Sequence, residues 1–420
     1  MMTVLILITV TALLLPLYVY LGYPLLLIVL DTLVSGKKVN RAPITPTLTM
    51  VVSCYNEIDI IEQKIKNCLE LDYPQQLIEF IFVSDGSDDG TDEAIKQHEC
   101  GNIKLIRQEG RLGKTMGLNL ALAAARGEII VFSDANAMYR TDALKMLARN
   151  FHDPSIGYVV GAALYVDGGE SASGANENAY WQYEIFMKNI ESRLHSVVGG
   201  DGAIYAIRKS LYRTLNSNDI NDFVNPLQII LQGYRGIFDE QAICYEQTAG
   251  DFDKEGKRKQ RIVNRSFTGL MNNKAVLNPF KVGFYAVEIW SHKLLRWLIP
   301  FFLLIAAFGI VILAQFEMVV FQVLLLFGIL FSWLIMLGYC LKGSGSCPGV
   351  LLIPYYFYLV NYNSLLGILQ SIKGEVQVTW STPRATQSTG AALSIKSLIV
   401  FTLLALFSVA LFVNTWSRIG

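Results

Sequence analysis

The chain has 420 residues, with 35 Lys and Arg against 35 Asp and Glu, and 52% of its residues are hydrophobic while only 17% are charged. Because about 25% of the residues in a typical globular domain are charged, the composition argues against an entirely soluble protein. The formal net charge is zero, whereas nucleic-acid-binding proteins usually carry an excess of basic residues, so we expect no nucleic-acid partner. The six cysteines show no CxxC spacing, which fits neither a zinc site nor a disulfide framework.

Residues 1–34 are predicted to form an N-terminal transmembrane anchor. The stretch Val4–Leu30 is apolar and carries no charge, which is long enough to cross a bilayer as a helix. A cleaved signal peptide would need a basic segment before the apolar run and a small-residue cleavage site after it, and the sequence has neither. Lys37, Lys38 and Arg41 follow, and by the positive-inside rule they predict that the next segment is cytoplasmic.

A second membrane region is predicted over residues 291–420. Apolar segments long enough to span a bilayer lie at about 297–315, 318–341 and 397–413. The segment 350–370 differs because it carries four tyrosines, whose rings prefer the headgroup level. We interpret it as an interfacial or re-entrant helix, with a full span as the alternative, followed by a cytoplasmic loop at about 373–393.

Residues 42–290 are predicted to form a cytoplasmic α/β domain with a mostly parallel sheet. Helical patterns alternate with runs rich in β-branched and apolar residues, which predict strands at Thr47–Ser53, Leu77–Ser84, Ile103–Ile106 and Ile129–Ser133. Strands separated by helices in this way are typical of βαβ units. Ligands bind at the carboxyl ends of such strands, and the polar clusters of this domain fall at those ends.

Three polar clusters carry candidate chemistry. Asp85 follows a strand on a Gly-containing turn, where a carboxylate can accept hydrogen bonds from a nucleobase or ribose, although a solvated turn is equally typical of these residues. Lys114 precedes a helix, so its ammonium and the helix N-terminus can face a phosphate. Asp134 and Asn136 can hold a divalent cation together with phosphate oxygens, or can simply form a capping turn.

In this order, the clusters resemble the family 2 glycosyltransferases with a GT-A fold. More narrowly, they resemble the membrane-bound branch that contains hyaluronan, chitin, cellulose and poly-N-acetylglucosamine synthases. The matching stretches are VVSCYNE, VSDGSDDGT, GRLGKTMGLN, VFSDANAMY, GGDGAIYAIRK and NDFVNPLQIILQGYRG. The resemblance covers roughly residues 42–290, and the flanking membrane segments are arranged similarly.

For the donor side, the resemblance implies the role of each residue. Glu57 and Asp85 would hold the uridine of a UDP-sugar, and Lys114 would touch its diphosphate. Asp134 and Asn136 occupy the positions at which the family binds Mg²⁺ or Mn²⁺ bridging the diphosphate. The second position is Asn here, which lowers the negative charge offered to the metal.

For the acceptor side, Asp201 lies in the stretch that matches the family's acceptor loop. Asp222 falls at the position of the family's general base, and such a base typically contributes about 10²–10⁴ in rate. Asp219 is a rival for the same role only three residues away. We favour Asp222 because Phe223 and Val224 continue a helix-like run after it.

Arg258 and Arg261 match the region in which the family carries a QxxRW motif, and both would neutralise the departing diphosphate. Ile262 stands where the family has a Trp that stacks on the acceptor sugar, which argues against processive polymerisation. Trp380, in the tripeptide Val378-Thr379-Trp380, resembles the cytoplasmic gating loop of the same enzymes.

These features predict an inverting, multi-pass glycosyltransferase of the cell membrane that transfers a sugar from a UDP-sugar to a growing polysaccharide, coupled to export. Single addition to a lipid-linked acceptor is an alternative that Ile262 favours. A transporter or scaffold with a degenerate nucleotide-binding domain is a third, which the presence of Asp85, Asp134 and Asp222 argues against. The expected partners are the donor, a glycan or lipid-linked acceptor, and membrane lipids.

Overall fold

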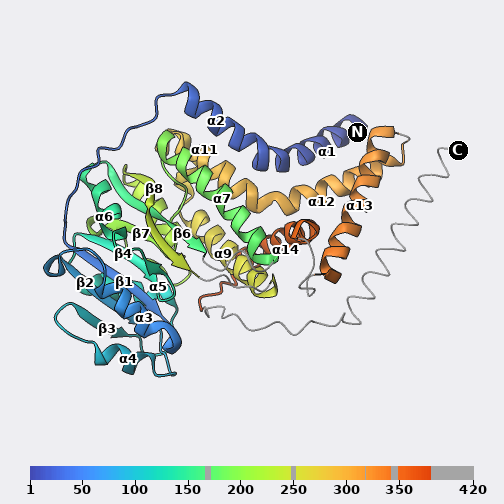
Figure 1. Ribbon diagram of the computed structural model, residues 1–420. Coiled ribbons are helices and arrows are strands. Elements are labelled where there is room, and N and C mark those ends of the chain that lie inside the picture. Colours follow the sequence, from blue (N-terminus) through green and yellow to red (C-terminus); the bar gives the residue numbers. More distant parts are fainter. Residues whose placement is uncertain (166–171, 247–251, 317, 342–348, 380–420) are drawn as a thin grey trace.

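A mixed sheet organises one end of the molecule, and long helices form the other end (Figure 1). The computed structural model describes residues 1–165, 172–246, 252–316, 318–341 and 349–379. Within these residues, the sheet has eight strands in the order β3-β2-β1-β4-β7-β6-β8-β5. Their bounds are β1 Leu48–Cys54, β2 Ile78–Ser84, β3 Ile103–Arg107, β4 Ile129–Asp134, β5 Met138–Tyr139, β6 Ile156–Tyr165, β7 Tyr205–Arg208 and β8 Arg235–Glu246.

The first half of the sheet is parallel. Strand β1 pairs in parallel with β2 and β4, and β2 pairs in parallel with β3. The connecting helices cover both faces, so β1 is buried along its whole length: Met50 and Val52 belong to one core and Val51 to the other. These helices are α3 Ile58–Leu69, α4 Thr91–Gln97 and α5 Lys114–Ala124. The predicted α/β class is confirmed.

The second half of the sheet mixes strand directions. Strand β7 is antiparallel to both β4 and β6, β6 is parallel to β8, and β5 is antiparallel to β8. Two short helices, α6 Ala143–Ala148 and α8 Asn221–Leu231, belong to this half. Because β1, β2 and β4 run in the same direction, the turns that follow them open on one edge of the sheet.

In the described part of the chain, three helical stretches are long and apolar enough to cross a membrane: Met2–Leu33, Tyr285–Ala314 and Val319–Leu341. The first comprises α1 Met2–Leu17, η1 Tyr18–Gly22 and α2 Tyr23–Leu33, and the third is α13 Val319–Leu341. The second comprises α11 Tyr285–Ile289, η6 Trp290–Leu294 and α12 Leu295–Ala314, so it begins upstream of the predicted start at 297. The predicted span at 397–413 lies outside the described residues.

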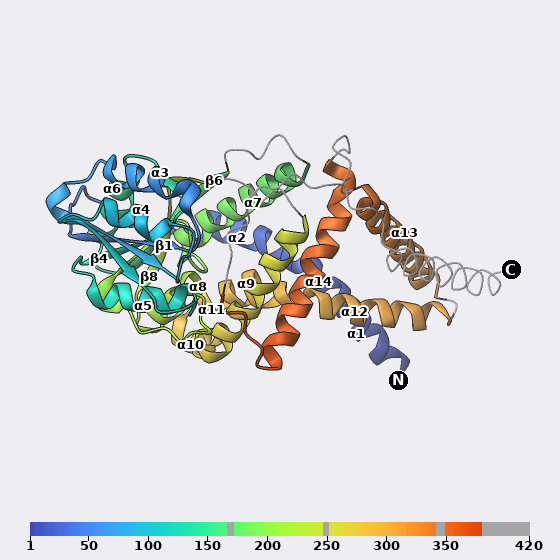
Figure 2. The same cartoon turned by 90° about the horizontal axis from the view of Figure 1, so that it is seen from below.

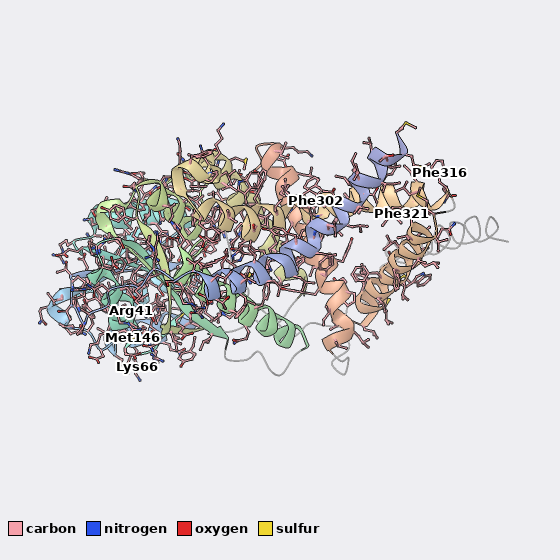
Figure 3. All side chains as sticks on the ribbon, turned by 90° about the horizontal axis from the view of Figure 1, so that it is seen from above. Arg41, Lys66, Met146, Phe302, Phe316 and Phe321 are labelled. Carbon is pink, nitrogen blue, oxygen red and sulfur yellow. The ribbon has the colours of Figure 1, made fainter. Side chains whose placement is uncertain are left out.

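The two ends of the molecule differ in their side chains (Figure 3). Arg41, Lys66 and Met146 lie on the α/β end, whereas Phe302, Phe316 and Phe321 lie among the long helices, the last two at the far end. Large apolar side chains of the long helices are exposed, including Phe308 at 68%. A water-soluble surface rarely presents contiguous apolar area of this kind, whereas a bilayer accommodates it.

Three further helices lie between the sheet and the long apolar helices (Figure 2): α7 Ala172–Leu194, α9 Phe252–Asn272 and α14 Ile353–Ile372. The segment predicted as interfacial, 350–370, falls mainly on α14, which packs along α9 and against α12 and α13. At Gly367 the two helices approach closely, because a Cβ there would lie 2.6 Å from the carbonyl oxygen of Gln260. The remaining short helix is α10 Pro279–Val282.

Candidate active site

Asp85 lies in a closed turn after β2, with 1% of its surface exposed. Its Oδ1 accepts hydrogen bonds from the backbone N–H of Gly113 and from Nε2 of Gln108, both at 2.8 Å. Its Oδ2 has no hydrogen-bond partner among the described residues. Burial raises the pKa of Asp85, while the backbone N–H groups of Gly113 and Leu112 oppose that rise. A buried oxygen without a partner is suited to accept a hydrogen bond from a ligand.

Glu57 lies at the neighbouring strand end and is 4% exposed. It directly precedes α3 as the N-cap, and its backbone N–H donates to Oγ1 of Thr91 at 2.8 Å, which ties the end of β1 to the start of α4. Beside it, the guanidinium of Arg111 lies 3.8 Å from the centre of the Tyr55 ring. Glu57 and Asp85 therefore follow the paired parallel strands β1 and β2 at the same edge of the sheet.

Lys114 and Asp134, predicted to act on the diphosphate and on a metal, are in direct contact. Lys114 is the first residue of α5, and its Nζ forms an ion pair with Oδ1 of Asp134, the last residue of β4. The preceding Gly113 has a φ of 92°, a backbone conformation that favours glycine and lets the helix begin immediately after the turn. The contact closes only part of the site, because the Asp134 side chain remains 36% exposed.

Asn136 lies on the same turn as Asp134, which the hydrogen bond from the Ala137 N–H to the Asp134 carbonyl oxygen closes at 3.2 Å. The pair offers one carboxylate and one amide oxygen. Within the described residues, no group of three or more His, Cys, Asp or Glu side chains forms a metal site. Mg²⁺ is commonly held by one or two carboxylates plus substrate phosphates, so the pair fits a cation shared with a diphosphate.

Asp222 lies in the first turn of α8, and it approaches Asp134 and Lys114 around Gly202. A Cβ at Gly202 would lie 3.4 Å from Oδ2 of Asp222, 3.5 Å from Oδ2 of Asp134 and 3.6 Å from Nζ of Lys114. The predicted base, metal ligand and phosphate ligand thus surround one small space that glycine leaves open. Burial raises the pKa of Asp222, and the charges of Asp201 and Asp134 add to the rise against Lys114 and Arg265.

Asp219 is engaged differently from Asp222. Its Oδ2 accepts hydrogen bonds from the backbone and side-chain nitrogens of Asn216 at 2.8 and 3.2 Å, and its carbonyl oxygen accepts from Thr115 and Arg265. These bonds hold the loop before α8; Oδ1 of Asp219 is buried and has no hydrogen-bond partner among the described residues, but Asp219 is not part of the cavity wall. Asp222 lines a cavity of about 480 Å³, and the geometry therefore favours it over Asp219 as the base.

Asp201 lies on the same cavity. Its Oδ1 accepts a hydrogen bond from the Ala203 N–H at 3.2 Å, and its Oδ2 lies 3.7 Å from Nζ of Lys188. Because Lys188 comes from α7, this pair joins the loop before β7 to the helical layer.

Helix α9 presents arginines at positions 258, 261 and 265, a spacing that places them on one face. Arg258 lines the cavity and donates to both carboxylate oxygens of Glu255, at 2.6 and 3.1 Å. Burial and then the charge of Arg258 lower the pKa of Arg261, while Asp134 and Asp222 oppose this. The carboxylates that act on Arg261 are thus those around Gly202.

Ile262, at the position of the expected tryptophan, lines the same cavity, and so does Trp297 from α12. The Trp297 ring meets Phe223 edge-on, with 5.5 Å between the ring centres. Helix α12 thus supplies an aromatic side chain to the cavity, where the motif itself has Ile262. Trp380 lies outside the described residues, but Val378 packs on Gly113: a Cβ there would lie 2.7 Å from its Cγ1.

Residues 49–215 match the family model described as Glycosyl transferase family 2. The chain contains a family 2 glycosyltransferase domain. The resemblance predicted from the ordered motifs is confirmed.

Poly-beta-1,6-N-acetyl-D-glucosamine synthase from Staphylococcus aureus (strain MSSA476) is 27% identical over 241 residues, which cover 54% of this chain and 58% of the relative. The enzyme of that name from Staphylococcus epidermidis is 30% identical over 116 residues, covering 27% of this chain and 28% of the relative. The chain thus spans just over half the length of the first of these relatives.

Among solved structures, the mannosyltransferase PcManGT from Pyrobaculum calidifontis in complex with GDP-Man and Mn²⁺ superposes with a TM-score of 0.60. The two chains are 22% identical, and the match covers 88% of this chain and 99% of the other. At this identity the likeness concerns the fold, and it supports the GT-A fold of the glycosyltransferase domain.

Four residues of the candidate site were not singled out from the sequence. The Arg258–Arg261 spacing, continued by one turn, would have pointed to Arg265, whose guanidinium donates to Thr115 Oγ1 at 2.8 Å. Gln108 and Lys188 carry no local signal, because their partners are distant in sequence. Glu246 ends β8, where burial and the charges of Asp134 and Asp201 raise its pKa to about 8.

Proposed function

We propose that the chain is an inverting membrane glycosyltransferase that transfers a sugar from a UDP-sugar to a hydroxyl of a glycan or lipid-linked acceptor. The observation that carries this proposal is the convergence of Asp222, Asp134 and Lys114 around Gly202. Asp85, with its unpartnered oxygen, lies behind the same edge of the sheet. Sugar transfer requires a nucleoside pocket, positive charge at the diphosphate and a base for the acceptor hydroxyl, and these residues can supply all three.

In this mechanism, Asp222 accepts the proton of the acceptor hydroxyl. At the same time the oxygen of that hydroxyl forms a bond to the anomeric carbon of the donor sugar. The bond from that carbon to the diphosphate oxygen breaks, and its electrons leave with UDP. The raised pKa of Asp222 makes it a better proton acceptor than an exposed aspartate. Lys114 and Arg261 stabilise the charge that develops on the diphosphate.

A bound Mg²⁺ or Mn²⁺ would supply further neutralisation of the leaving diphosphate. Asp134 and Asn136 are the residues that would hold it, and Lys114, which pairs with Asp134 in this structure, would then turn to the diphosphate. Because Asn136 brings no charge, Asp134 is expected to dominate this site.

The identity of the donor nucleotide is inferred from the sequence motifs and not from the solved structure of similar fold. The motif resemblance predicts UDP, whereas the solved structure of similar fold holds GDP-Man. We propose a UDP-sugar, held by Glu57 and Asp85. Titration of the purified protein with UDP and with GDP distinguishes the two donors, and UDP is expected to bind more tightly. Asp85→Asn should weaken the binding of UDP and leave the weaker binding of GDP unchanged.

The finer proposal is a polysaccharide that grows at the cytoplasmic face of the cell membrane and is exported as it grows. Lys37, Lys38 and Arg41 support the orientation, and the staphylococcal relatives support the kind of product. Cysteine labelling from outside spheroplasts tests the orientation: a single cysteine at position 377 should stay unlabelled. Efficient labelling there would place the 373–393 loop outside.

The experiment that tests the transfer itself is incubation of the protein in lipid with a panel of radiolabelled UDP- and GDP-sugars, followed by sizing of the product. Transfer from a UDP-sugar is expected. Bound nucleotide without transfer from any sugar would instead favour the degenerate nucleotide-binding scaffold.

A further inference from the structure

The cavity next to Asp222 extends into the membrane region. One end is lined by Asp201 and Asp222, and the other by side chains of α12 and α14, including Trp297 and Phe357. Figure 2 shows α14 and α12 crossing beside α9 at this junction. The proposed site of transfer is therefore continuous with a space beside α12, which belongs to the stretch Tyr285–Ala314 that is long and apolar enough to cross a membrane.

The membrane-side wall of this cavity is mainly apolar, with Asn361 and Ser364 of α14 as its polar side chains. Ile353, Phe357 and Val360 line it from α14, and the Phe357 ring lies 6.0 Å from the ring centres of both Tyr20 and Phe331. A free sugar would lose hydrogen bonds to water against such a wall. A hydrocarbon chain would gain about 25 cal/mol for each Å² of apolar surface removed from water. The wall therefore favours a hydrocarbon.

Two lysines line the cavity at the joint between α7 and the membrane helix. An ion pair between Glu184 and Arg296 holds this joint at 2.5 Å. Lys188 follows Glu184 by one turn, Lys293 precedes Arg296 by one turn, and both ammonium groups belong to residues of the cavity wall. Lys188 also lies 3.7 Å from Asp201, which places a positive charge beside the acceptor loop.

Lys293 stands out among these groups. It is half-buried, and the part of the chain that the structure describes gives its ammonium no ion pair or hydrogen bond. Glu184, an acid of the same joint, already accepts hydrogen bonds from Arg296 at 2.5 Å and from His292 at 3.0 Å. An unpaired, partly desolvated ammonium is unfavourable, and a phosphate would satisfy it through a charge-assisted hydrogen bond.

We propose that the acceptor is a lipid-linked sugar whose linking phosphate is held by Lys188 and Lys293. Its hydrocarbon chain lies along the wall formed by Ile353, Phe357 and Val360, and its free sugar hydroxyl reaches Asp222. The cavity presents an apolar wall, a basic joint and a base, and a phosphate-linked lipid sugar offers the matching chain, phosphate and hydroxyl. This inference rests on the proposed transfer function and names the acceptor class of that site.

The test compares two acceptors with the same sugar and the same long alkyl chain, joined by a phosphate in one and by a neutral glycosidic bond in the other. In Lys293→Gln, the KM for the phosphate-linked acceptor should rise about tenfold or more, because a charge-assisted hydrogen bond is lost. The KM for the neutral acceptor should stay within about twofold. Lys281→Gln, which changes an exposed lysine of α10, is the matched control and should alter neither.

A second variant tests the chain. Val360→Trp fills the apolar wall, so it should raise the KM for the long-chain acceptor and leave that for a methyl-capped analogue unchanged. Equal effects of Lys293→Gln on both acceptors, or equal use of a sugar without any lipid, would overturn the acceptor class. If only the acceptor class is wrong, the unaltered protein should still bind UDP and still hydrolyse the UDP-sugar. If the unaltered protein neither binds UDP nor cleaves a UDP-sugar, the transfer function itself is wrong.

Discussion

Gly202→Ala adds one methyl group at the point where the base, the metal ligand and the phosphate ligand meet. The new Cβ would lie 3.4 Å from Asp222 Oδ2, 3.5 Å from Asp134 Oδ2 and 3.6 Å from Lys114 Nζ, which are ordinary contact distances. The backbone at Gly202 has no positive φ, so alanine fits without strain. The folded protein should therefore accept the change. The free energy of unfolding should rise by about 0.4–1 kcal/mol, because alanine lowers the conformational entropy of the unfolded chain.

Catalysis should respond in the opposite way. The added methyl occupies space that the reacting sugar and diphosphate must enter, and reacting atoms need to approach to about 3–3.5 Å. A displacement of about 1 Å costs about 10² in rate. We therefore expect turnover in Gly202→Ala to fall by about 10². The affinity for UDP should change only a few-fold, because the proposed nucleoside pocket lies at Asp85.

The assay measures sugar transfer, UDP binding and thermal melting on the same preparation. Gly101→Ala is the matched control, since a Cβ at Gly101 would meet nothing within 4 Å and this glycine lies far from the site. It should leave transfer unchanged. Full turnover in Gly202→Ala would refute the view that the reaction takes place in the space around this glycine, and a fall in melting temperature would show that the substitution acts on the fold.

Three further predictions concern charge. Excess chelator should abolish transfer, and Asn136→Asp should lower the Mg²⁺ concentration that restores half-maximal activity, because a carboxylate attracts the ion more strongly than an amide; full activity in chelator would exclude the cation. Burial and neighbouring acids raise the pKa of Asp222, so kcat/KM should fall on the acid side above the usual aspartate range near about 3.9, and Asp201→Asn should move that fall to lower pH; an unmoved profile would contradict the assignment. The pKa of Glu246 is raised to about 8, which means that the folded state favours the neutral form of this side chain. The free energy of unfolding, measured in chelator, should therefore decline as the pH rises from the pKa of Glu246 in the unfolded chain to about 8. Glu246→Gln should flatten that decline in a series of melting curves at increasing pH.

The proximity of the candidate donor-side residues was predictable because it depends on local patterns. Asp85, Lys114 and Asp134 each follow a strand or open a helix, and parallel strands bring such turns to one edge. The sequence pattern therefore predicts that these side chains lie close together. The antiparallel strand β7 was not predicted, because four residues between two loops carry too weak a pattern.

The acceptor side was harder because its walls come from distant parts of the chain. Trp297 meets Phe223 across more than seventy positions of sequence, and Lys293 reaches the joint with α7 only through the packing of Arg296 on Glu184. Neither contact has a local signature. The apolar run of α12 predicted a span, but its periodicity does not tell which turn of the helix faces the site.

Sugar transfer with Asp222 as the base is the central claim, and turnover of Asp222→Asn beside Asp219→Asn tests it most directly. Asp222→Asn keeps size and polarity but cannot accept the acceptor proton, so turnover should fall by about 10² or more while UDP binding changes only a few-fold. Asp219→Asn should retain turnover, since its carboxylate holds the loop at Asn216. If Asp222→Asn retains most turnover while Asp219→Asn abolishes it, the base is Asp219. If neither substitution lowers turnover, the proposed mechanism is wrong.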